Sequence, residues 1–497
     1  RRVLFRSERT RNPMIAETQW VKVQVAALAS IPAQHAQPLA MFAVDLFGQR
    51  ATLHITSQEW VLGYRVFHGS VPGRISDAHL VVSASGACSG LIDLDAHSFA
   101  LAYSGIGDLH VLQRIDPDRL PPHMHCATDH SFAVSAPPVP SIDTGTNSDC
   151  GYTIVDLMVC YTPQARTNAG GVTAIESAIL GAVAQANQAH LDCATGMQLR
   201  LVHLHEVTYV ENGSSSDLTA LQDPIDGVMD EVHTLRDTYG ADLVQLITDP
   251  SPAQYCGIGY LMTSLTTGFS PFAFGVTLRT CISNRSMTHE TGHNLGCHHD
   301  IANAGAALYP YSYGYRTPDN AYRTIMAYAP GTRVNVFSGP NVVYSGYTMG
   351  VAGSADNVQT LANTGTTASQ FTPTKAPVFC DLGGGIPGAG GRPTMTGSGT
   401  INSASPLQVE LRSFPANAAG VLIVGLSHID VPMFGGTLVP SFDIGLGILG
   451  TGTSIVHDAS WLASLPQGLQ VWLQSAFLDS TAPFGLCASD ALRVTTP

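Results

Sequence analysis

Hydrophobic and polar residues alternate over short segments through the first part of the chain. Between Pro38 and Leu112 such segments, for example residues 51–55 and 98–103, are separated by Gly, Ser and Asp. Alternation with a period of two places successive side chains on opposite faces of a strand, and the small residues between segments favour turns. This pattern predicts a β-meander in the N-terminal region.

The middle of the chain has strand and helix patterns in alternation. β-prone runs cover residues 153–161, 199–207 and 242–248, and apolar residues recur at helical spacing over residues 173–190 and 225–235. Thr173 and Glu176 have the spacing of a capping box, which would begin the first helix. Strands that alternate with amphipathic helices predict a mixed α/β layer.

From about Met395 to Pro497 the pattern returns to short β-prone runs without a helical period, notably residues 407–411, 420–426, 469–478 and 491–495. About 100 residues of this kind predict an all-β sandwich. Two roles fit such a domain equally well. One is attachment to a substrate or surface, and the other is a structural or sorting role.

Two breaker-rich segments divide these regions. Residues 135–149 are rich in Ser, Pro and Thr, and residues 383–393 are mostly Gly and Pro. Such compositions are typical of exposed linkers. For 497 residues, at roughly 150 residues per domain, we expect three domains. The predicted division is a β-rich domain with its linker, a central domain, a Gly/Pro-rich linker and a β-sandwich: 1–148, 149–372, 373–394 and 395–497.

The candidate chemistry lies in the stretch HETGHNLGCHHD, which begins at position 289. His289 and His293 are one helical turn apart, so both imidazoles can face one metal ion. Gly296 can end the helix in a left-handed conformation and return His299 to the same ion. Three imidazoles leave a fourth position for water, which indicates a catalytic Zn²⁺ site with Glu290 as the proton acceptor.

A solvated helix that happens to be rich in histidine is the alternative. It would suit two isolated histidines better than it suits this longer pattern. His298 matches no ligand position, so we expect an ordinary polar histidine or one that contacts the ligands. Cys297 is also outside the pattern, and is either a buried small hydrophobic residue or half of a disulfide.

The pattern HExxHxxGxxH is the metzincin signature, and the chain resembles that metalloprotease family. The resemblance implies an α+β catalytic domain with a mixed sheet, a zinc helix and a Met turn. The segment RTIMAY supplies that turn, with Met326 below the ligand histidines. Tyr328 resembles the tyrosine that in astacin-like and serralysin-like members approaches the zinc and stabilises an oxyanion. A tyrosine packed within the turn is the alternative.

Within the metzincins, residues 153–372 resemble the bacterial reprolysin-like and peptidyl-Asp metallopeptidase group. Asp300, directly after the third histidine, is the mark of the adamalysin side, whereas Tyr328 departs from its usual pattern. The resemblance implies cleavage on the amino side of Asp, for which a partly buried arginine in the S1′ wall would be needed. Arg323 and Arg333 flank the Met turn and are the candidates, with solvated surface arginines as the alternative.

In metzincins of this kind an N-terminal β-rich domain is a propeptide, which often silences the enzyme through a cysteine on the zinc. Cys126 is the best-placed candidate for such an inhibitory switch, since a thiolate would displace the nucleophilic water. Its surroundings do not match the familiar animal switch motif. A disulfide with Cys88 is the alternative.

Ten cysteines are scattered singly and suit disulfides in an oxidising compartment. We favour a disulfide between Cys256 and Cys281. These residues bracket residues 269–280, where we expect the edge strand that pairs with the substrate backbone. A disulfide between Cys380 and Cys487 could close the C-terminal region.

Charge narrows the choice of partners. The chain has 37 acidic and 23 basic residues, a formal net charge of −14, so nucleic acid and anionic membranes are poor partner candidates. No apolar run reaches some 18 residues, which predicts no membrane span. We expect a monomer that acts on protein or peptide substrates. Because the chain begins with Arg1 rather than Met, we also expect a truncated or foreign start and a lost signal peptide.

These patterns together predict a secreted zinc-dependent endopeptidase that is made as a zymogen. The competing function is a catalytically silent, zinc-containing adhesion or binding protein on the same fold. Such pseudoenzymes usually lose the glutamate or a metal ligand, and this sequence keeps Glu290 and all three histidines.

Overall fold

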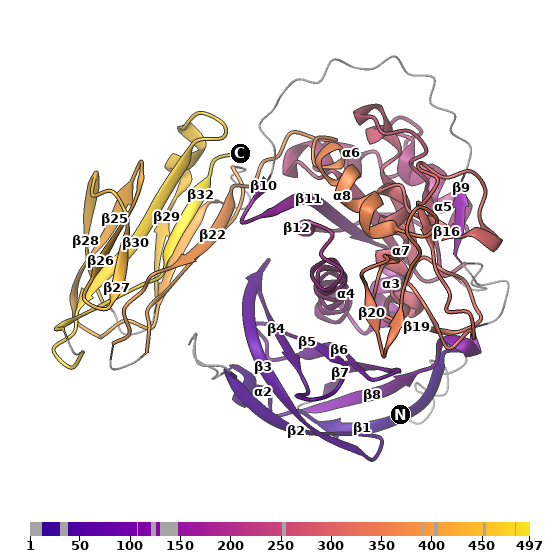
Figure 1. Cartoon of the computed structure of the whole chain (residues 1–497), viewed down its shortest axis with the longest axis horizontal. Coiled ribbons are helices and arrows are strands. Elements are labelled where there is room, and N and C mark those ends of the chain that lie inside the picture. The colour runs from indigo at the N-terminus through magenta and orange to yellow at the C-terminus, as the bar shows by residue number, and fades with distance from the viewer. Residues whose placement is uncertain are drawn as a thin grey trace.

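The structure is a computed structural model in which the chain forms three groups of strands (Figure 1). An N-terminal sheet lies against one side of a central α/β unit, and C-terminal sheets lie on another side of that unit. The residues that the structure describes are 12–29, 38–106, 108–120, 126–129, 148–250, 255–388, 391–401, 406–450, 454–482 and 484–497.

The N-terminal sheet has eight antiparallel strands in the order β1-β8-β7-β6-β5-β4-β3-β2. Consecutive strands from β2 to β8 are neighbours, so the predicted β-meander is present. Phe67, Leu94 and Phe99 are buried within it. The elements of this region are β1 (Ile15–Lys22), α2 (Val25–Ala29), β2 (Ala40–Leu46), β3 (Gln49–Val61), β4 (Tyr64–Ser70), β5 (Ser76–Val82), β6 (Cys88–Leu94), β7 (His97–Ile106), β8 (Leu109–Ile115) and η1 (Pro117–Arg119).

The central sheet has the order β10-β11-β13-β15-β14-β9, with β12 also paired to β11. Strands β11, β12, β13 and β15 are mutually parallel, and β14 runs antiparallel to β15. The mixed sheet predicted from the sequence is therefore confirmed. The strands are β9 (Ala127–Asp129), β10 (Ser148–Asp149), β11 (Tyr152–Tyr161), β12 (Met197–Glu206), β13 (Leu243–Thr248), β14 (Gly257–Tyr260) and β15 (Phe274–Leu278).

The substrate-pairing edge strand was predicted within residues 269–280, and this position is wrong. Strand β15, which lies there, is internal because β13 pairs with one side of it and β14 with the other. Strand β14 is the last strand that the central region contributes, and its outer side pairs with β9 from the N-terminal region. A buried apolar run in the sequence does not by itself tell an internal strand from an edge strand.

Helix α4 (Val172–Asp192) lies between the N-terminal sheet and the central sheet (Figure 1). Its N-cap is Gly171, which makes no side-chain capping bond, so the predicted capping box is wrong. The Glu176 carboxylate instead accepts hydrogen bonds from the hydroxyls of Tyr64, at 2.5 Å, and Tyr161, at 3.0 Å. A glutamate that looked like a capping residue thus joins the two sheets.

The remaining helices surround the central sheet. The helix predicted over residues 225–235 is displaced, because the chain turns through residues 223–230 between α5 and α6. The elements are α3 (Pro163–Ala169), α5 (Ser214–Gln222), α6 (Glu231–Tyr239), η3 (Thr267–Phe272), η4 (Arg279–Asn284), α7 (Ser286–Asn294), η5 (Ile301–Asn303) and α8 (Asn357–Ala368). Of the helices described, none is long and apolar enough to cross a membrane alone, and only the sharply bent pair α3 and α4 reaches that length together.

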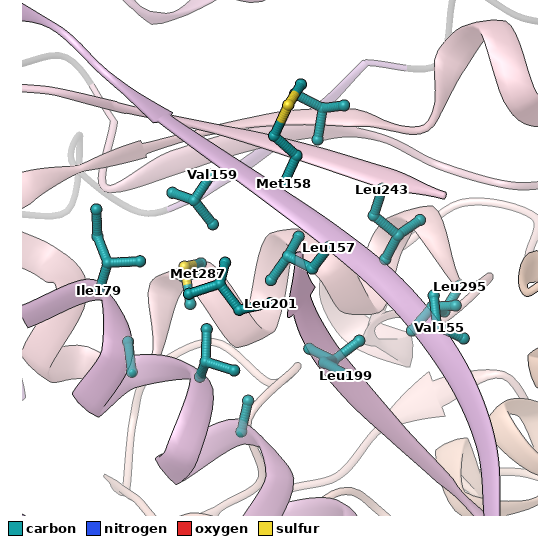
Figure 2. Close-up of a cluster of buried hydrophobic side chains, with 14 of the residues drawn as sticks. Val155, Leu157, Met158, Val159, Ile179, Leu199, Leu201, Leu243, Met287 and Leu295 are labelled. Atoms are coloured by element: carbon teal, nitrogen blue, oxygen red, sulfur yellow. The ribbon is translucent and has the colours of Figure 1, made fainter. Parts of the chain in front are cut away.

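Strand β11 and helix α7 share one hydrophobic core (Figure 2). Val155, Leu157 and Val159 of β11 are fully buried, and the cluster continues to Met287 and Leu295 at the two ends of α7. Burial of such a side chain stabilises the fold by about 1.5–3 kcal/mol. The core therefore fixes the position of the helix that carries the first two histidines.

After α7 the chain forms short paired strands and then the C-terminal sheets. The C-terminal strands form a six-stranded sheet that includes β31, a three-stranded sheet and a hairpin, and the first two sheets share one buried cluster. The short strands are β16 (His298–Asp300), β17 (Tyr313–Gly314), β18 (Tyr322–Arg323), β19 (Thr332–Arg333), β20 (Val343–Tyr344) and β21 (Tyr347–Thr348). The C-terminal elements are β22 (Val378–Gly383), β23 (Thr394–Ser398), β24 (Gln408–Arg412), β25 (Ala419–Gly425), β26 (His428–Met433), β27 (Gly436–Pro440), β28 (Ile444–Leu449), β29 (Ser454–Asp458), η6 (Ser460–Ser464), β30 (Gln470–Leu478), β31 (Leu486–Ala488) and β32 (Ala491–Thr495).

Part of the predicted Gly/Pro-rich linker, residues 373–394, is regular structure. Residues 378–383 form β22, which pairs with β32 near the end of the chain. The other predicted linker, residues 135–149, lies outside the described residues except for β10.

Two disulfides join cysteines of this chain. The bond between Cys256 and Cys281 confirms the prediction. The predicted partner of Cys380 is wrong, since Cys380 is bonded to Cys150 and Cys487 is a free thiol. Cys150 and Cys380 thus connect the start of the central region to the first C-terminal strand.

Candidate active site

Helix α7 presents His289, Glu290 and His293 from one short, buried segment. The helix ends at Asn294, and Gly296 follows with a φ of +86° that residues with a side chain rarely adopt. A Cβ at Gly296 would also lie 2.6 Å from the Leu308 side chain. The glycine therefore permits the turn that returns the chain to β16, which carries His299.

The three imidazole rings converge on one point. The Nε2 atom of His293 lies 3.0 Å from Nε2 of His289 and 3.1 Å from Nε2 of His299. The rings of His289 and His293 place Nδ1 at 2.9 and 2.8 Å from the carbonyl oxygens of Ile325 and Cys297. Because a carbonyl oxygen only accepts hydrogen bonds, the ring proton must be on Nδ1. The lone pair of each Nε2 is then available to a metal ion.

The protonation state also suits a metal ion. Burial lowers the pKa of His289 and of His299 well below the ordinary value, so these rings are neutral. Neutral imidazoles with fixed Nδ1 protons are the usual nitrogen ligands of zinc. The arrangement therefore fits the zinc ion that the sequence implies.

The carboxylate of Glu290 lies beside this site and is fully buried. Burial raises its pKa well above the ordinary value, while the nearby Cys126 thiol and Arg333 guanidinium act to lower it. Gly257 and Gly259 of β14 make the space for this side chain. A Cβ at Gly257 would lie 2.7 Å from Glu290 Cδ, and one at Gly259 would lie 3.2 Å from Oε2.

Met326 lies beneath the histidines. Its side chain is fully buried, and a Cβ at Gly292, between the two helical histidines, would lie 2.7 Å from the Met326 sulfur. Asp300 connects this turn to the third histidine, because its carboxylate accepts the backbone N–H of Tyr328 at 3.0 Å and Nη2 of Arg316 at 2.9 Å. The structure therefore gives Asp300 a contact through which it holds the Met turn against β16.

Tyr328 lies over the histidines, with its ring centroid 4.1 Å from that of His299. Its hydroxyl donates a hydrogen bond to the carbonyl oxygen of Cys126, a residue of the N-terminal region. Burial raises the pKa of Tyr328, so the phenol keeps its proton and can donate. The contact joins the Cys126 carbonyl to the phenol whose ring lies beside that of His299.

Cys126 of the N-terminal region lies at the site. The Cys126 sulfur and the nearest ligand atoms of His289 and Glu290 all lie within 4.8 Å of one another. The thiol is free and buried, and Cys88 is also a free, buried thiol, so the alternative disulfide between them is wrong. The next residues form β9, which extends the central sheet along β14.

Both predicted specificity arginines are buried, so the alternative of solvated surface arginines is wrong. Arg323 donates to the carbonyl oxygens of Gly331 at 2.7 Å and Ala327 at 2.8 Å, contacts that fold the loop after the Met turn. Arg333 donates to the carbonyl oxygen of Asn284 at 3.1 Å, and its Nε has no hydrogen-bond partner among the described residues. Of the two arginines, Arg333 therefore has an N–H group that could donate a hydrogen bond to a ligand.

Two features of the site were not predicted. Two glycines within a short strand, Gly257 and Gly259 of β14, were a usable signal for a close approach of another group. The buried Arg285, directly before α7, gave no signal, because a single arginine between two helical segments is normally a solvated residue.

Comparisons with known proteins agree with this geometry. A sequence model of a reprolysin-type family, which is described as metallo-peptidase family M12, matches residues 152–338. A peptidyl-Asp metalloendopeptidase of Stenotrophomonas maltophilia strain R551-3 is 32% identical over 392 residues, which cover 72% of this chain and 87% of that protein. The enzyme of the same name from Xanthomonas campestris pv. campestris is 33% identical over 270 residues, or 53% of this chain and 62% of that protein. The chain belongs to metallopeptidase family M12, in the group of the peptidyl-Asp metalloendopeptidases, and is a zinc metalloendopeptidase.

Proposed function

We propose that the chain is a secreted endopeptidase, made as a zymogen, that prefers Asp at P1′. Residues 1–148 are its propeptide domain and linker, residues 149–372 its catalytic domain, and residues 395–497 an accessory β-sandwich. The convergence of three Nε2 atoms beside the Glu290 carboxylate is the observation that carries the proposal. His289, His293 and His299 would hold the zinc.

When bound, zinc would supply a Lewis acid for the scissile carbonyl and lower the pKa of a water molecule. Glu290 accepts the proton of that water and returns it to the leaving amine. Tyr328 donates its hydroxyl hydrogen bond to the developing oxyanion, as it donates to the Cys126 carbonyl in the full chain.

Caseinolysis with and without a metal chelator tests the central proposal most directly. After cleavage of the linker that precedes residue 148, we expect casein hydrolysis that chelation abolishes and added zinc restores. A cleaved protein with bound zinc and no hydrolysis would favour the silent binding protein instead. The presence of Glu290 argues against that alternative.

The zymogen proposal rests on Cys126 and the strand that follows it. Cys126 would act as the inhibitory switch, with its thiolate taking the place of the nucleophilic water. Strand β9 would occupy the outer edge of β14, and Tyr328 would be held by the Cys126 carbonyl.

A cysteine substitution separates the switch from simple steric blockage. We expect Cys126→Ser to give measurable peptidase activity before linker cleavage, because serine binds zinc poorly. Cys88→Ser, another buried free thiol of the same region, should leave the full chain latent. Equal latency of the wild type and both variants would show that the strand alone blocks the site.

The preference for Asp rests on Arg333, whose guanidinium is buried close to the Cys126 thiol. A buried guanidinium with an unpaired N–H favours a carboxylate ligand. Arg323 would support it by holding the loop. Cleavage-site profiling on a denatured protein tests this, and sites without enrichment of Asp at P1′ would contradict it.

Secretion is supported by the two disulfides, since such bonds persist in oxidising compartments. Mass mapping of both bonds in protein recovered from the culture medium would test it. For the C-terminal sheets we propose attachment to a substrate or surface. Deletion of residues 395–497 should then reduce hydrolysis of insoluble protein and leave hydrolysis of a short peptide unchanged.

A further inference from the structure

Arg285 lies at the start of α7, one helical turn before the first histidine. Its φ of 62° is left-handed, and its carbonyl oxygen accepts the backbone N–H of His289 at 3.0 Å. Its side chain is only 2% exposed. A charged group is therefore buried close to the zinc ligands, where the proposed reaction does not use it.

The guanidinium of Arg285 is only partly satisfied. Its Nη2 lies 2.7 Å from Oδ1 of Asp93 and 3.3 Å from the hydroxyl of Ser98. Both of these residues belong to the N-terminal sheet. Its Nε and Nη1 are buried and have no hydrogen-bond partner among the residues described. Unpaired, buried guanidinium nitrogens are costly unless a ligand takes them up.

The central region holds the Asp93 carboxylate from two sides. While Arg285 binds Oδ1, Oδ2 accepts a hydrogen bond from Nε2 of Gln185 in α4 at 2.9 Å. Arg285 and Gln185 both belong to the proposed catalytic domain. If the propeptide leaves, these two side chains remain as a vacant site of the shape and charge of a carboxylate.

This site opens onto a cavity of about 350 Å³ between the two regions. Arg285 and Arg333 of the central region line this cavity together with Asp192 of α4, and the N-terminal region contributes Asp77, Asp93 and Asp95. The unpaired Nε of Arg333 adds a third N–H group to the two of Arg285. Removal of the N-terminal sheet would take away three of the four carboxylates of this cavity, including Asp93, the partner of Arg285, and would leave Asp192.

Arg333 connects the cavity with the zinc site. Its Nη1 donates to the carbonyl of Asn284, next to Arg285, at 3.1 Å, and its Nη2 donates to the carbonyl of Ala327, next to Met326 of the Met turn, at 3.5 Å. Arg333 therefore joins the Met turn to the segment that carries Arg285.

We propose that Arg285 is a specificity-determining residue, which with Arg333 forms a pocket for the carboxylate of an acidic substrate side chain. In the full chain Asp93 occupies part of this pocket. The proposal rests on the proposed peptidase function and adds the residue that provides selectivity. An Asn side chain has the same shape as Asp but brings no charge to the two guanidinium groups, so it binds poorly.

The test uses two fluorogenic peptides that differ only in Asp or Asn at P1′, with enzyme activated by linker cleavage. We expect Arg285→Met to lower the ratio of kcat/KM for Asp over Asn by at least about 10-fold, with cleavage of the Asn peptide nearly unchanged. Arg285→Lys should keep part of the ratio. Arg166→Met, which removes a surface ion pair with Glu206, should leave the ratio unchanged. An Arg285→Met enzyme with the wild-type ratio would overturn the proposal.

A second measurement needs no peptidase activity. In the uncleaved chain, Asp93→Ala should open the pocket, so that acetate raises the melting temperature of this variant more than an equal concentration of chloride does. Asp45→Ala, at an exposed position of the same sheet, should gain nothing from acetate. Equal responses of the two variants would overturn the carboxylate pocket. If the wild type cleaves neither peptide, the peptidase proposal fails while the acetate result still decides the pocket.

Discussion

The two ends of α7 are built differently, although one helical turn separates them. At the histidine end, Nδ1 of His289 and of His293 is bound to a backbone carbonyl, so ring orientation is fixed and each Nε2 faces the metal position. At the other end, two buried nitrogens of Arg285 find no hydrogen-bond partner within the described part of the chain. Polar groups whose hydrogen bonds are all made are held in one geometry, whereas polar groups that lack a partner can still bind a ligand.

This difference separates reaction from selectivity on one helix. Changes at the histidine end should slow cleavage of Asp and Asn peptides by equal factors, because they alter the shared chemistry. Changes at the arginine end should alter the ratio between the peptides. A substitution near the histidines that changed the ratio strongly would break the comparison.

Loss of a metal ligand should have the largest effect. His299→Ala removes one of three converging Nε2 atoms. Loss of a group that only hydrogen-bonds to a metal ligand lowers metal affinity by roughly 10–100-fold. Loss of a ligand itself should lower zinc affinity by more than this. Activity towards both peptides should disappear with the metal. Mass spectrometry under native conditions measures the zinc content, and full occupancy in the variant would contradict the ligand assignment.

Glu290→Gln should have the next largest effect, and it should keep the metal. The amide cannot accept a proton from water, so turnover should fall on the order of 10²–10⁴-fold for both peptides. Zinc content and melting temperature serve as controls and should match the wild type. Near-normal hydrolysis by this variant would refute Glu290 as the base.

Gly257→Ala should act through Glu290 without touching the substrate. The new Cβ would overlap the carboxylate, which must then move, and a shift of about 1 Å in a catalytic group costs on the order of 100-fold in rate. Gly259→Ala is the matched control, because its Cβ would lie 3.2 Å from the carboxylate oxygen and should cost much less. Equal losses in both variants would point to a general disturbance of β14.

Strands such as β3, β7, β11, β12 and β13 could be predicted from periodicity, because each has an alternating or continuous set of apolar residues that the fold buries. The order of the strands could not be predicted in this way. Strand β15 reads as a strand of the kind expected beside a substrate, yet long-range pairing with β13 and β14 makes it internal. The same limit applies to Cys380, whose partner Cys150 lies far away in the sequence.

At the site, the motif located the residues whose roles depend on fixed spacing along one helix and turn. His289, His293 and His299 were found because zinc coordination demands that spacing, and their Nε2 atoms do converge. Arg285 and Gly257 were missed, because their roles arise from contacts with distant strands. Arg333 is buried rather than solvated, and no local pattern in the sequence predicts the burial of a single arginine.

Tyr328→Phe should have the smallest effect of this series, and it decides between an oxyanion donor and a packed tyrosine. The phenylalanine keeps the ring contact with His299 and loses only the hydroxyl. If the hydroxyl stabilises the oxyanion, kcat should fall on the order of 10–100-fold for both peptides with KM nearly unchanged. If the tyrosine only packs, kcat should stay within about 2-fold of the wild type. Because the hydroxyl also holds the Cys126 carbonyl, the same variant should make the uncleaved chain less latent.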